Sequence, residues 1–301
     1  MTRRTLVILP LLLVGLAACG SDDADAGSNL TIVSTTTILG DVVRNVVNGN
    51  AAVEELIPLG LDPHEFQASA QQVAALQAAD LVIANGLGLE AGLGDVLETA
   101  AADGANVLEV APLLDPIPFG AQDGRGSDDP HVWMDPLRMA DAARLIGVEL
   151  AALDPEGEWP ARAEEYATAL IAADEEIAAI LDAVGPENRK MVTNHDSLGY
   201  FALRYGFDIV GIVIPGGSTL GDPSSAELAE LVAVIEREGV NAIFVETTQP
   251  SALAETVAAE AGEDVQIVEL YTGSLGTPGS GADTLIGMLV TNAQIVAEAS
   301  A

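Results

Sequence analysis

Apolar and polar residues alternate along the chain with two different periods. Short apolar runs rich in β-branched residues, such as Leu30–Thr35 and Asp80–Asn85, are typical of strands buried on both faces of a parallel sheet. Between these runs, apolar residues recur with helical spacing, as in Leu39–Val47, which indicates amphipathic helices. Strands and helices therefore follow one another in turn. This order predicts an α/β fold with parallel sheets and right-handed crossovers.

The alternation occurs twice, on either side of the longest helical pattern. In the first half we expect strands at Leu30–Thr35, Val53–Pro58, Asp80–Asn85 and Asn106–Val110, and helices at Leu39–Val47, after a Ser69–Gln72 capping box, and at Glu90–Ala102. In the second half we expect strands at Lys190–Asn194, Phe207–Ile214, Asn241–Glu246 and Val265–Leu270, and helices at Ser197–Arg204, Pro223–Glu238, Pro250–Ala261 and Asp283–Ala299. Between the halves, Pro155–Val184 would form a helix of about 45 Å at about 1.5 Å per residue. We expect an N-terminal α/β lobe at 29–152, a connecting helix at 153–186 and a C-terminal α/β lobe at 187–301.

The first residues predict an export signal. Arg3 and Arg4 provide a basic start, and the apolar run Leu6–Leu16 is too short to span a bilayer stably. Small residues then lead to Cys19, the only cysteine, in a pattern that resembles the lipobox of bacterial lipoproteins. We therefore expect a signal peptide at 1–18, a lipidated tether at 19–28 and an extracytoplasmic protein anchored to the bacterial cell membrane through Cys19. A plain secretory signal with an incidental cysteine is less favoured, because Cys19 stands where a lipobox requires it.

Acidic residues greatly outnumber basic ones. With 46 Asp and Glu against 11 Lys and Arg the formal net charge is −35, and loss of residues 1–18 with their two arginines would make it −37. Such a charge argues against binding nucleic acid or anionic headgroups, since phosphates would be repelled, and it attracts cations. Solubility or a saline-adapted proteome explains the charge equally well. The single cysteine excludes an internal disulfide and a thiolate zinc site, and the sequence contains no glycine-rich phosphate loop.

The candidate chemistry lies in the three histidines of the chain. His64 and His131 both occur in the tripeptide Asp-Pro-His, and His195 follows an expected strand. After His131, Asp135 and Pro136 are typical of the N-cap and first residue of a helix. All three histidines fall in loops on the side where open α/β sheets bind ligands. A lone histidine is more often a surface or hydrogen-bonded residue, but three at equivalent positions favour metal ligands.

Each histidine also has an aspartate beside it in the sequence: Asp62, Asp129 and Asp196. A metal-bound imidazole needs a partner on its other ring nitrogen, and these carboxylates are candidates for that role. A turn or helix cap explains each of them equally well. The histidines are separated by 67 and 64 residues, too far for a local motif, so a shared site requires folding.

The ordered set DPHEFQAS, DPHVWMDP, NHDSLGYFALRYGF, FVETTQP and YTGSLG, with the lipobox and the long central helix, resembles a known family. It is similar to the metal-ion substrate-binding lipoproteins that serve bacterial ABC importers of zinc or manganese. The resemblance covers essentially the whole chain after the signal. It implies two α/β lobes joined by a rigid helix, with one metal in the cleft between them. It also implies that His64, His131 and His195 are three of four ligands.

The fourth ligand position departs from the family pattern. Members commonly have an acidic residue where this chain has Gly273, which carries no ligand atom in its side chain. Water, Glu246 or Asp283 are the alternatives for completing the shell. Glu246 also has a structural interpretation, as a buried hydrogen-bonding or salt-bridged acid, which we prefer.

This departure bears on the choice of metal. Manganese-type members of the family usually have glutamate at the third position, where this chain has His195. Three imidazoles with an open or water-filled fourth position favour Zn²⁺, and Mn²⁺ is the less favoured ligand. The loop Gly120–Asp129 is acidic and has no histidine, unlike the histidine-rich loops of some zinc members, and its role is open.

We therefore expect a monomeric, non-catalytic receptor that captures Zn²⁺ and delivers it to the permease of an ABC importer. A manganese-binding member of the same family is one alternative. A zinc hydrolase is another, since three histidines and a water also form a catalytic arrangement, but no HExxH or paired acid/base motif supports it. A surface adhesin or structural lipoprotein with an incidental metal is the third.

Overall fold

The computed structural model describes residues 28–119, 127–262 and 264–300. The N-terminal part contains β1 (Thr31–Ser34), α1 (Thr37–Val47), β2 (Ala52–Glu55), α2 (Ala70–Ala78), β3 (Leu81–Ala84), α3 (Gly94–Ala102), β4 (Val107–Glu109), the short 3-10 turns η1 (Ala111–Leu113) and η2 (Val132–Met134), and α4 (Pro136–Leu153). The long helix α5 (Trp159–Leu181) follows. The C-terminal part contains η3 (Pro186–Asn188), β5 (Lys190–Thr193), α6 (Gly199–Tyr205), β6 (Asp208–Ile212), α7 (Ser225–Glu238), β7 (Ala242–Glu246), α8 (Ala252–Ala261), β8 (Gln266–Leu270) and α9 (Leu285–Ala299).

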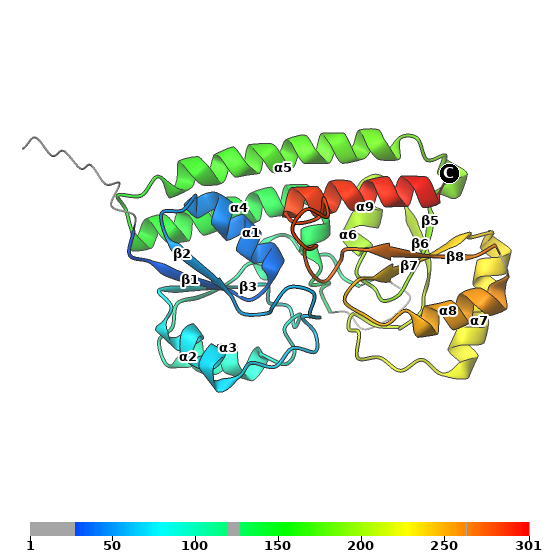
Figure 1. Cartoon of the computed structure of the whole chain (residues 1–301), viewed down its shortest axis with the longest axis horizontal. Coiled ribbons are helices and arrows are strands. Elements are labelled where there is room, and N and C mark those ends of the chain that lie inside the picture. The colour runs from blue at the N-terminus through cyan, green and yellow to red at the C-terminus, as the bar shows by residue number, and fades with distance from the viewer. Residues whose placement is uncertain (1–27, 120–126, 263, 301) are drawn as a thin grey trace, which may run out of the picture.

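These elements form two α/β lobes that lie side by side, with α5 running across both (Figure 1). Each lobe has a 4-stranded sheet, in the order β2-β1-β3-β4 in the first and β6-β5-β7-β8 in the second. All neighbouring strands in both sheets are parallel. The two sheets therefore repeat one topology, and the expected α/β fold with two similar lobes is confirmed.

Successive residues of a strand point to opposite faces of the sheet, and each face has its own apolar core. In β1, Ile32 belongs to a core shared by both lobes, whereas Val33 belongs to a smaller core beneath α2 and α3. In β5, Met191 faces the shared core and Val192 the core beneath α7 and α8. Because both faces of the inner strands β3 and β7 are buried, these strands appear in the sequence as continuous apolar runs, whereas the edge strand β2 is partly exposed and contains two glutamates.

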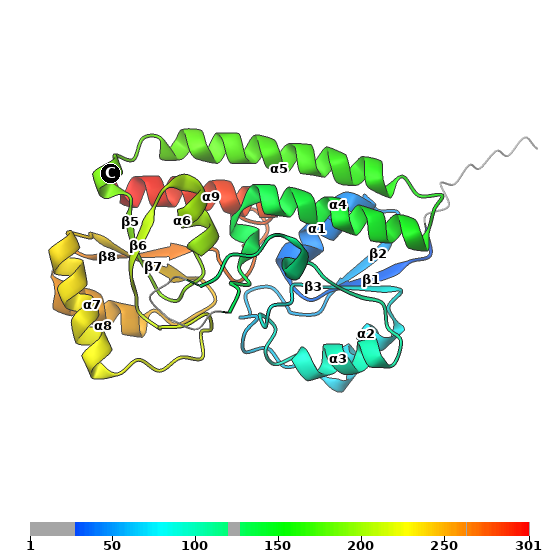
Figure 2. The ribbon, with the colours of Figure 1, turned by 180° about the vertical axis from the view of Figure 1, so that it is seen from behind.

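The shared core continues from one lobe into the other through α1, α4, α5, α6 and α9. Figures 1 and 2 show α9 lying alongside α5, with α4 under its other half. With 23 residues, α5 spans about 34 Å at about 1.5 Å per residue. Among the helices of the three described ranges, none is both long and apolar enough to cross a membrane.

Two expected helices start a full turn later in the structure than their patterns predict, α3 at Gly94 and α5 at Trp159. We expected α3 to begin at Glu90, but the carboxylate of this residue instead accepts hydrogen bonds from the backbone N–H groups of Asn85 and Gly86. We expected α5 to begin at Pro155, but Asp154 closes a turn there, since its carbonyl accepts from the Trp159 indole at 3.0 Å. In both places a local hydrogen bond competes with the helix. The pattern of apolar and polar residues does not predict that hydrogen bond.

The capping signals predicted from the sequence are confirmed. Ser69 and Gln72 form a reciprocal capping box at the start of α2. Asp135 is the N-cap of α4, accepting from the backbone N–H of Leu137, with Pro136 as the first helical residue. The predicted signal peptide, Cys19 and residues 120–126 of the acidic loop lie outside the described residues.

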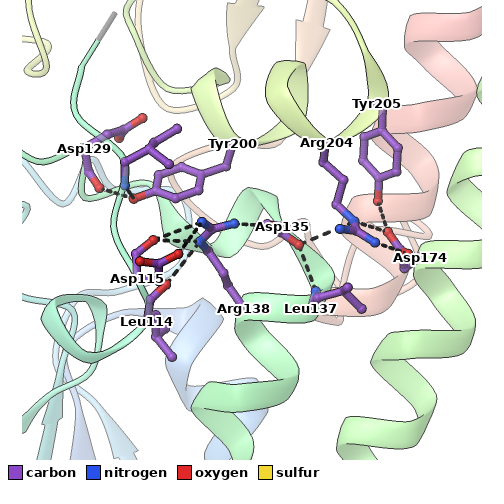
Figure 3. Close-up of polar contacts among 11 residues, drawn as sticks. Leu114, Asp115, Asp129, Asp135, Leu137, Arg138, Asp174, Tyr200, Arg204 and Tyr205 are labelled. Atoms are coloured by element: carbon purple, nitrogen blue, oxygen red, sulfur yellow. Dashed lines mark hydrogen bonds and ion pairs between the residues drawn. The ribbon is translucent and has the colours of Figure 1, made fainter.

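Polar contacts on the α5 side of the molecule join the lobes to the linking helix (Figure 3). Arg204 on α6 pairs with both carboxylate oxygens of Asp174 on α5, and its Nε lies 3.6 Å from Oδ1 of Asp135 at the start of α4. Asp135 also accepts from Arg138 at 2.6 Å, and Tyr205 donates to Asp174 at 2.9 Å. One network therefore connects the first lobe, the second lobe and α5.

Arg204→Met should lower the free energy of unfolding by about 2 kcal/mol, because charge-assisted hydrogen bonds to the partly buried Asp174 are lost. Chemical denaturation followed by circular dichroism measures the effect. Arg237→Met is the control, since the Arg237 side chain is 63% exposed beside Glu238, and it should change stability by less than about 0.5 kcal/mol. Equal effects of the two substitutions would contradict the structural role of the network.

Candidate metal site

The three histidines meet where the two lobes face each other. His64 lies in the loop between β2 and α2, His131 directly precedes η2, and His195 follows β5. Nε2 of His131 lies 3.3 Å from Nε2 of His64 and 3.2 Å from Nε2 of His195. Among the described residues, the possible ligand atoms of these three histidines all lie within 4.8 Å of one another. Residues from distant parts of the chain thus direct three nitrogens at one point.

This geometry suits a single ion. Zinc binds imidazole nitrogen at about 2.0–2.1 Å, and tetrahedral angles then separate two such nitrogens by about 3.4 Å. The spacings of 3.3 and 3.2 Å around His131 are close to that value. The rings are at most 3% exposed. The site is therefore sized for a desolvated metal ion rather than for an organic ligand.

Burial also keeps the imidazoles in the form that a metal requires. Desolvation, with a smaller contribution from the neighbouring His131, lowers the pKa of His64 from 6.5 to about 3. Desolvation and the other two rings hold the pKa of His195 well below 6.5. At neutral pH these rings are therefore uncharged and offer lone pairs.

His131 is oriented from several directions. Oδ1 of Asp129 accepts from the His131 backbone N–H at 2.9 Å and lies 2.7 Å from its Nδ1, which leaves Nε2 for the site. Asn85, after β3, donates to the Pro130 carbonyl at 2.9 Å. Tyr200 of the second lobe donates to the Asp129 carbonyl at 2.6 Å, as Figure 3 shows. The His131 segment is thus fixed by residues of both lobes.

His64 is held differently, although it occurs in the same tripeptide. Oδ1 of Asp62 accepts from the His64 backbone N–H at 2.9 Å, as Asp129 does for His131. The other oxygen of Asp62 accepts from Thr219 at 2.6 Å and from Gln249. Thr219 and Gln249 belong to loops of the second lobe. The Asp62 carboxylate therefore positions the backbone of its histidine and joins the lobes.

His195 is paired with a buried acid. Its Nδ1 contacts Oε1 of Glu246 at the end of β7, and Oε2 of Glu246 accepts from Thr248 at 3.2 Å. Asp196, beside His195, is also buried. Three buried polar atoms near these strand ends have no hydrogen-bond partner among the described residues: Thr193 Oγ1, Asn194 Nδ2 and Thr272 Oγ1.

The proposed sources of a fourth ligand lie in different places. A Cβ atom on Gly273 would lie 2.9 Å from Thr248 Oγ1, 3.4 Å from Pro63 and 3.5 Å from Glu246 Oε2, so this position faces the site. Glu246 is adjacent, but its carboxylate contacts the ring nitrogen of His195 that points away from the cluster. Asp283 is exposed and accepts from the Gly279 backbone N–H at 2.9 Å.

Trp133 links the site to the Gly273 loop. Its indole packs edge-on against His131 with 5.2 Å between ring centroids. Its Nε1 donates to the Thr272 carbonyl at 2.7 Å, across the lobe boundary. A groove of about 570 Å³ between the lobes is lined by Ile117 and Asp129 of the first lobe and by residues of β6 and α7 of the second, and no histidine lines it. Trp133 thus connects His131 of the first lobe to the second lobe.

The sequence analysis missed five residues that support the histidines: Asn85, Glu90, Tyr200, Thr219 and Gln249. Glu90 accepts from Thr35 Oγ1 at 2.6 Å and from the Asn85 N–H at 2.8 Å, and burial raises its pKa. Asn85 follows an apolar strand directly, a signal that was available at the sequence level. Tyr200, Thr219 and Gln249 carry no such signal, because their partners are distant in sequence. The contacts of Glu90 with Asn85 and Gly86 are local, but the residue pattern favours a helix there instead.

Comparison with known proteins gives one consistent result. Residues 32–299 match the family described as zinc-uptake complex component A, periplasmic. The chain is 33% identical over 291 residues to the manganese-binding lipoprotein MntA of Halalkalibacterium halodurans, covering 95% of this chain and 94% of the relative. It is 31% identical to the zinc-binding protein TroA of Treponema pallidum, covering 94% and 93%.

Solved structures agree with this result. The periplasmic zinc-binding protein TroA from Treponema pallidum superposes with a TM-score of 0.84 at 29% identity, covering 91% of this chain and 100% of that one. A manganese-bound periplasmic metal-binding protein from Candidatus Liberibacter asiaticus shares the fold, with a TM-score of 0.79 at 24% identity and coverage of 91% and 100%.

The stability of the chelator-treated protein should fall as the pH drops below 6.5. Unfolded histidine takes up a proton near pH 6.5, whereas folded His64 does so only near pH 3, so the unfolded state binds more protons between these values. His64→Gln should reduce this slope by up to about 1.4 kcal/mol per pH unit. Urea unfolding at several pH values between about 7.5 and about 4.5, where the protein is folded without urea, measures both slopes. Identical slopes would contradict the depressed pKa.

Proposed function

The chain belongs to the zinc-uptake complex component A family, and we propose that it captures Zn²⁺ outside the cytoplasm and delivers it to the permease of an ABC importer. As a member of this family it is the extracytoplasmic metal-binding component of a metal importer, and not an enzyme. The hydrolase alternative is therefore set aside. The proposal concerns which metal is carried, which residues bind it and how the protein is anchored.

The observation that carries the proposal is the convergence of Nε2 of His64, His131 and His195 on one buried point. We propose these three as the ligands of the transported ion. Ligands from both lobes would close over the ion, and the stiff helix α5 would limit how far the lobes separate. The cargo is then retained by chelation and released when the lobes move apart.

Zinc is favoured over manganese by the donor set. Nitrogen donors bind Zn²⁺ more tightly than Mn²⁺, whereas manganese sites are usually rich in oxygen. No carboxylate oxygen belongs to the converging group found among the described residues. The relatives do not decide the question, since one is named for manganese and another for zinc. Manganese remains the alternative cargo for that reason.

Two buried carboxylates support binding of a divalent ion. Asp129 and Glu246 contact the outer nitrogens of His131 and His195, and both are at most 5% exposed. A carboxylate on the outer nitrogen fixes the tautomer and makes the ring a stronger donor. Their two negative charges would offset the charge of one divalent ion, so a neutral ligand shell can hold it in a buried site.

We further propose that water completes the shell. Gly273 has no ligand atom in its side chain, a Cβ there would lie only 2.9 Å from Thr248 Oγ1, and Glu246 already contacts His195. An exchangeable fourth position is compatible with a protein that must give up its metal. Asp283 is a poor candidate because it is exposed and engaged with the Gly279 loop.

The anchoring and the domain division follow the sequence. We propose that residues 1–18 are removed as a signal peptide and that Cys19 carries the lipid, with 19–28 as the tether. We propose lobes at 29–152 and 187–301 joined by a connecting segment at 153–186, acting as a monomer. The curated relatives include lipoproteins of metal importers, which supports this arrangement.

The protein without its first 28 residues should retain one zinc per chain after dialysis against equal Zn²⁺ and Mn²⁺, measured by native mass spectrometry. His64→Ala, His131→Ala and His195→Ala should each lose the metal, because two imidazoles cannot hold it against dialysis. Asp283→Asn is the control and should keep it. Manganese retained over zinc would mean that a carboxylate completes the shell, and retention by all three histidine variants would refute the site.

Cys19→Ala should move the full-length protein from the membrane fraction to the soluble extracytoplasmic fraction, because the lipid attachment point is gone. Fractionation followed by immunoblotting measures the distribution. Ser21→Ala, two residues away, is the matched control and should stay with the membrane. Continued anchoring of Cys19→Ala would rule out the lipobox.

A further inference from the structure

The two Asp-Pro-His tripeptides use their aspartates differently. We infer that Asp62 is a positioning residue that couples His64 to the second lobe through Thr219 and Gln249, and so controls how fast the metal leaves. The inference rests on the proposed function, since it concerns retention of the ion at the same site. It assigns a role to Asp62, Thr219 and Gln249. These residues contact no side chain of the proposed ligands, but they fix the position of His64.

The Asp62 carboxylate is 8% exposed and is held by donors from both lobes. One oxygen accepts from the His64 backbone N–H at 2.9 Å, within the first lobe. The other accepts from the Thr219 hydroxyl at 2.6 Å and from the Gln249 amide, both in the second lobe. A buried carboxylate with uncharged donors depends on all of them, because any lost donor leaves negative charge poorly solvated.

Asp62 and Asp129 make the same backbone contact but differ in their remaining contacts. Both aspartates accept from the backbone N–H two residues ahead at 2.9 Å, so the local turn is the same. Asp129 then contacts Nδ1 of its own histidine at 2.7 Å. Asp62 instead directs its second oxygen to the opposite lobe. The contacts of Asp62 therefore depend on the relative position of the two lobes, whereas those of Asp129 depend on its own histidine ring.

His64 is also the ligand most free to move when the lobes separate. Asp129 fixes the His131 ring, and Glu246 fixes the His195 ring from within its own sheet. On the α5 side, the Arg204–Asp174 pair holds the lobes together (Figure 3). The His64 loop has no regular structure between β2 and α2.

The His64 loop reaches the second lobe at two points. Besides Asp62, the Gly60 N–H donates to Ser274 at 2.9 Å. Breaking the Asp62 contacts to Thr219 and Gln249 should therefore loosen this loop without freeing it. The withdrawal of one nitrogen would leave the ion on two imidazoles, from which it escapes quickly. Metal release then begins at His64.

The test is the rate of zinc release, measured by stopped-flow mixing of the zinc-loaded protein with an excess of a fluorescent chelator. Thr219→Val with Gln249→Met removes both second-lobe donors at similar volume. We expect dissociation to accelerate by about tenfold or more, as loss of a hydrogen bond to a charged group predicts. The stoichiometry should remain one zinc, because all three histidines are present.

Matched variants separate this role from a general structural one. Ser218→Ala with Gln294→Met changes a neighbouring hydroxyl and an exposed amide that do not contact Asp62, and should release zinc at the original rate. Thr219→Ser alone, with Gln249 unaltered, keeps a hydroxyl that can donate to Asp62. It should release zinc as slowly as the unaltered protein. The metal-free double variant should unfold at a lower midpoint, because the buried Asp62 carboxylate loses two donors. A purely structural role would also lower the zinc stoichiometry, which should instead remain one per chain.

The outcomes are distinguishable. If the unaltered protein binds one zinc and the Thr219/Gln249 variant releases it at the same rate, the coupling is refuted and the proposed function stands. If release accelerates equally in the Ser218/Gln294 control, the effect is not specific to Asp62 and the inference is again refuted. If the unaltered protein binds no zinc, the proposed function itself fails.

Discussion

The structure depends on holding three imidazole rings together in a buried place. The nitrogens around His131 are only 3.2 and 3.3 Å apart, with each ring at most 3% exposed, so the arrangement has no access to bulk water. At this separation one ring nitrogen can donate to its neighbour in the appropriate tautomer, and a cation between the rings would instead take the lone pairs of all three. Carboxylates on the outer side of two of the rings, Asp129 and Glu246, prepare the site for such a cation. Burying three polar rings together costs free energy, which the rest of the fold must offset.

The frame around the cluster explains how this cost is met. A core that is continuous from one lobe to the other, through helices such as α5 and α9, holds the two sheets in one orientation. Charged contacts, such as those between Arg204 and Asp174, reinforce this orientation. Farther from α5, the lobes meet through single hydrogen bonds such as those of Asp62 and Gly60. The interface is thus strong beside the linking helix and weaker around one ligand, which suits a receptor that must both hold and release an ion.

The excess of acidic residues adds a long-range effect to this short-range chemistry. A formal net charge of −35 draws cations toward the protein, but it does not distinguish one divalent ion from another. In the function proposed above, selectivity arises at the three histidines, because nitrogen donors bind zinc more tightly than manganese. The replacement of an acidic residue by Gly273 acts in the same direction, since it removes an oxygen donor from the position that faces Glu246.

The sequence by itself determined the alternation of strands and helices, the repeat of that alternation in two lobes and the caps at Ser69 and Asp135, because these depend on residues close together in the chain. It also singled out the histidines, since the Asp-Pro-His tripeptide occurs twice. It did not determine that α3 and α5 begin late, because a side chain or carbonyl competes locally for the hydrogen bonds. Only the tertiary structure decided that histidines separated by 64 and 67 residues share one point, and that Asp62 serves the opposite lobe while Asp129 serves its own ring. The physical reason is that identical local sequences acquire different partners when the packing of two lobes, and not the local pattern, places the neighbouring donors.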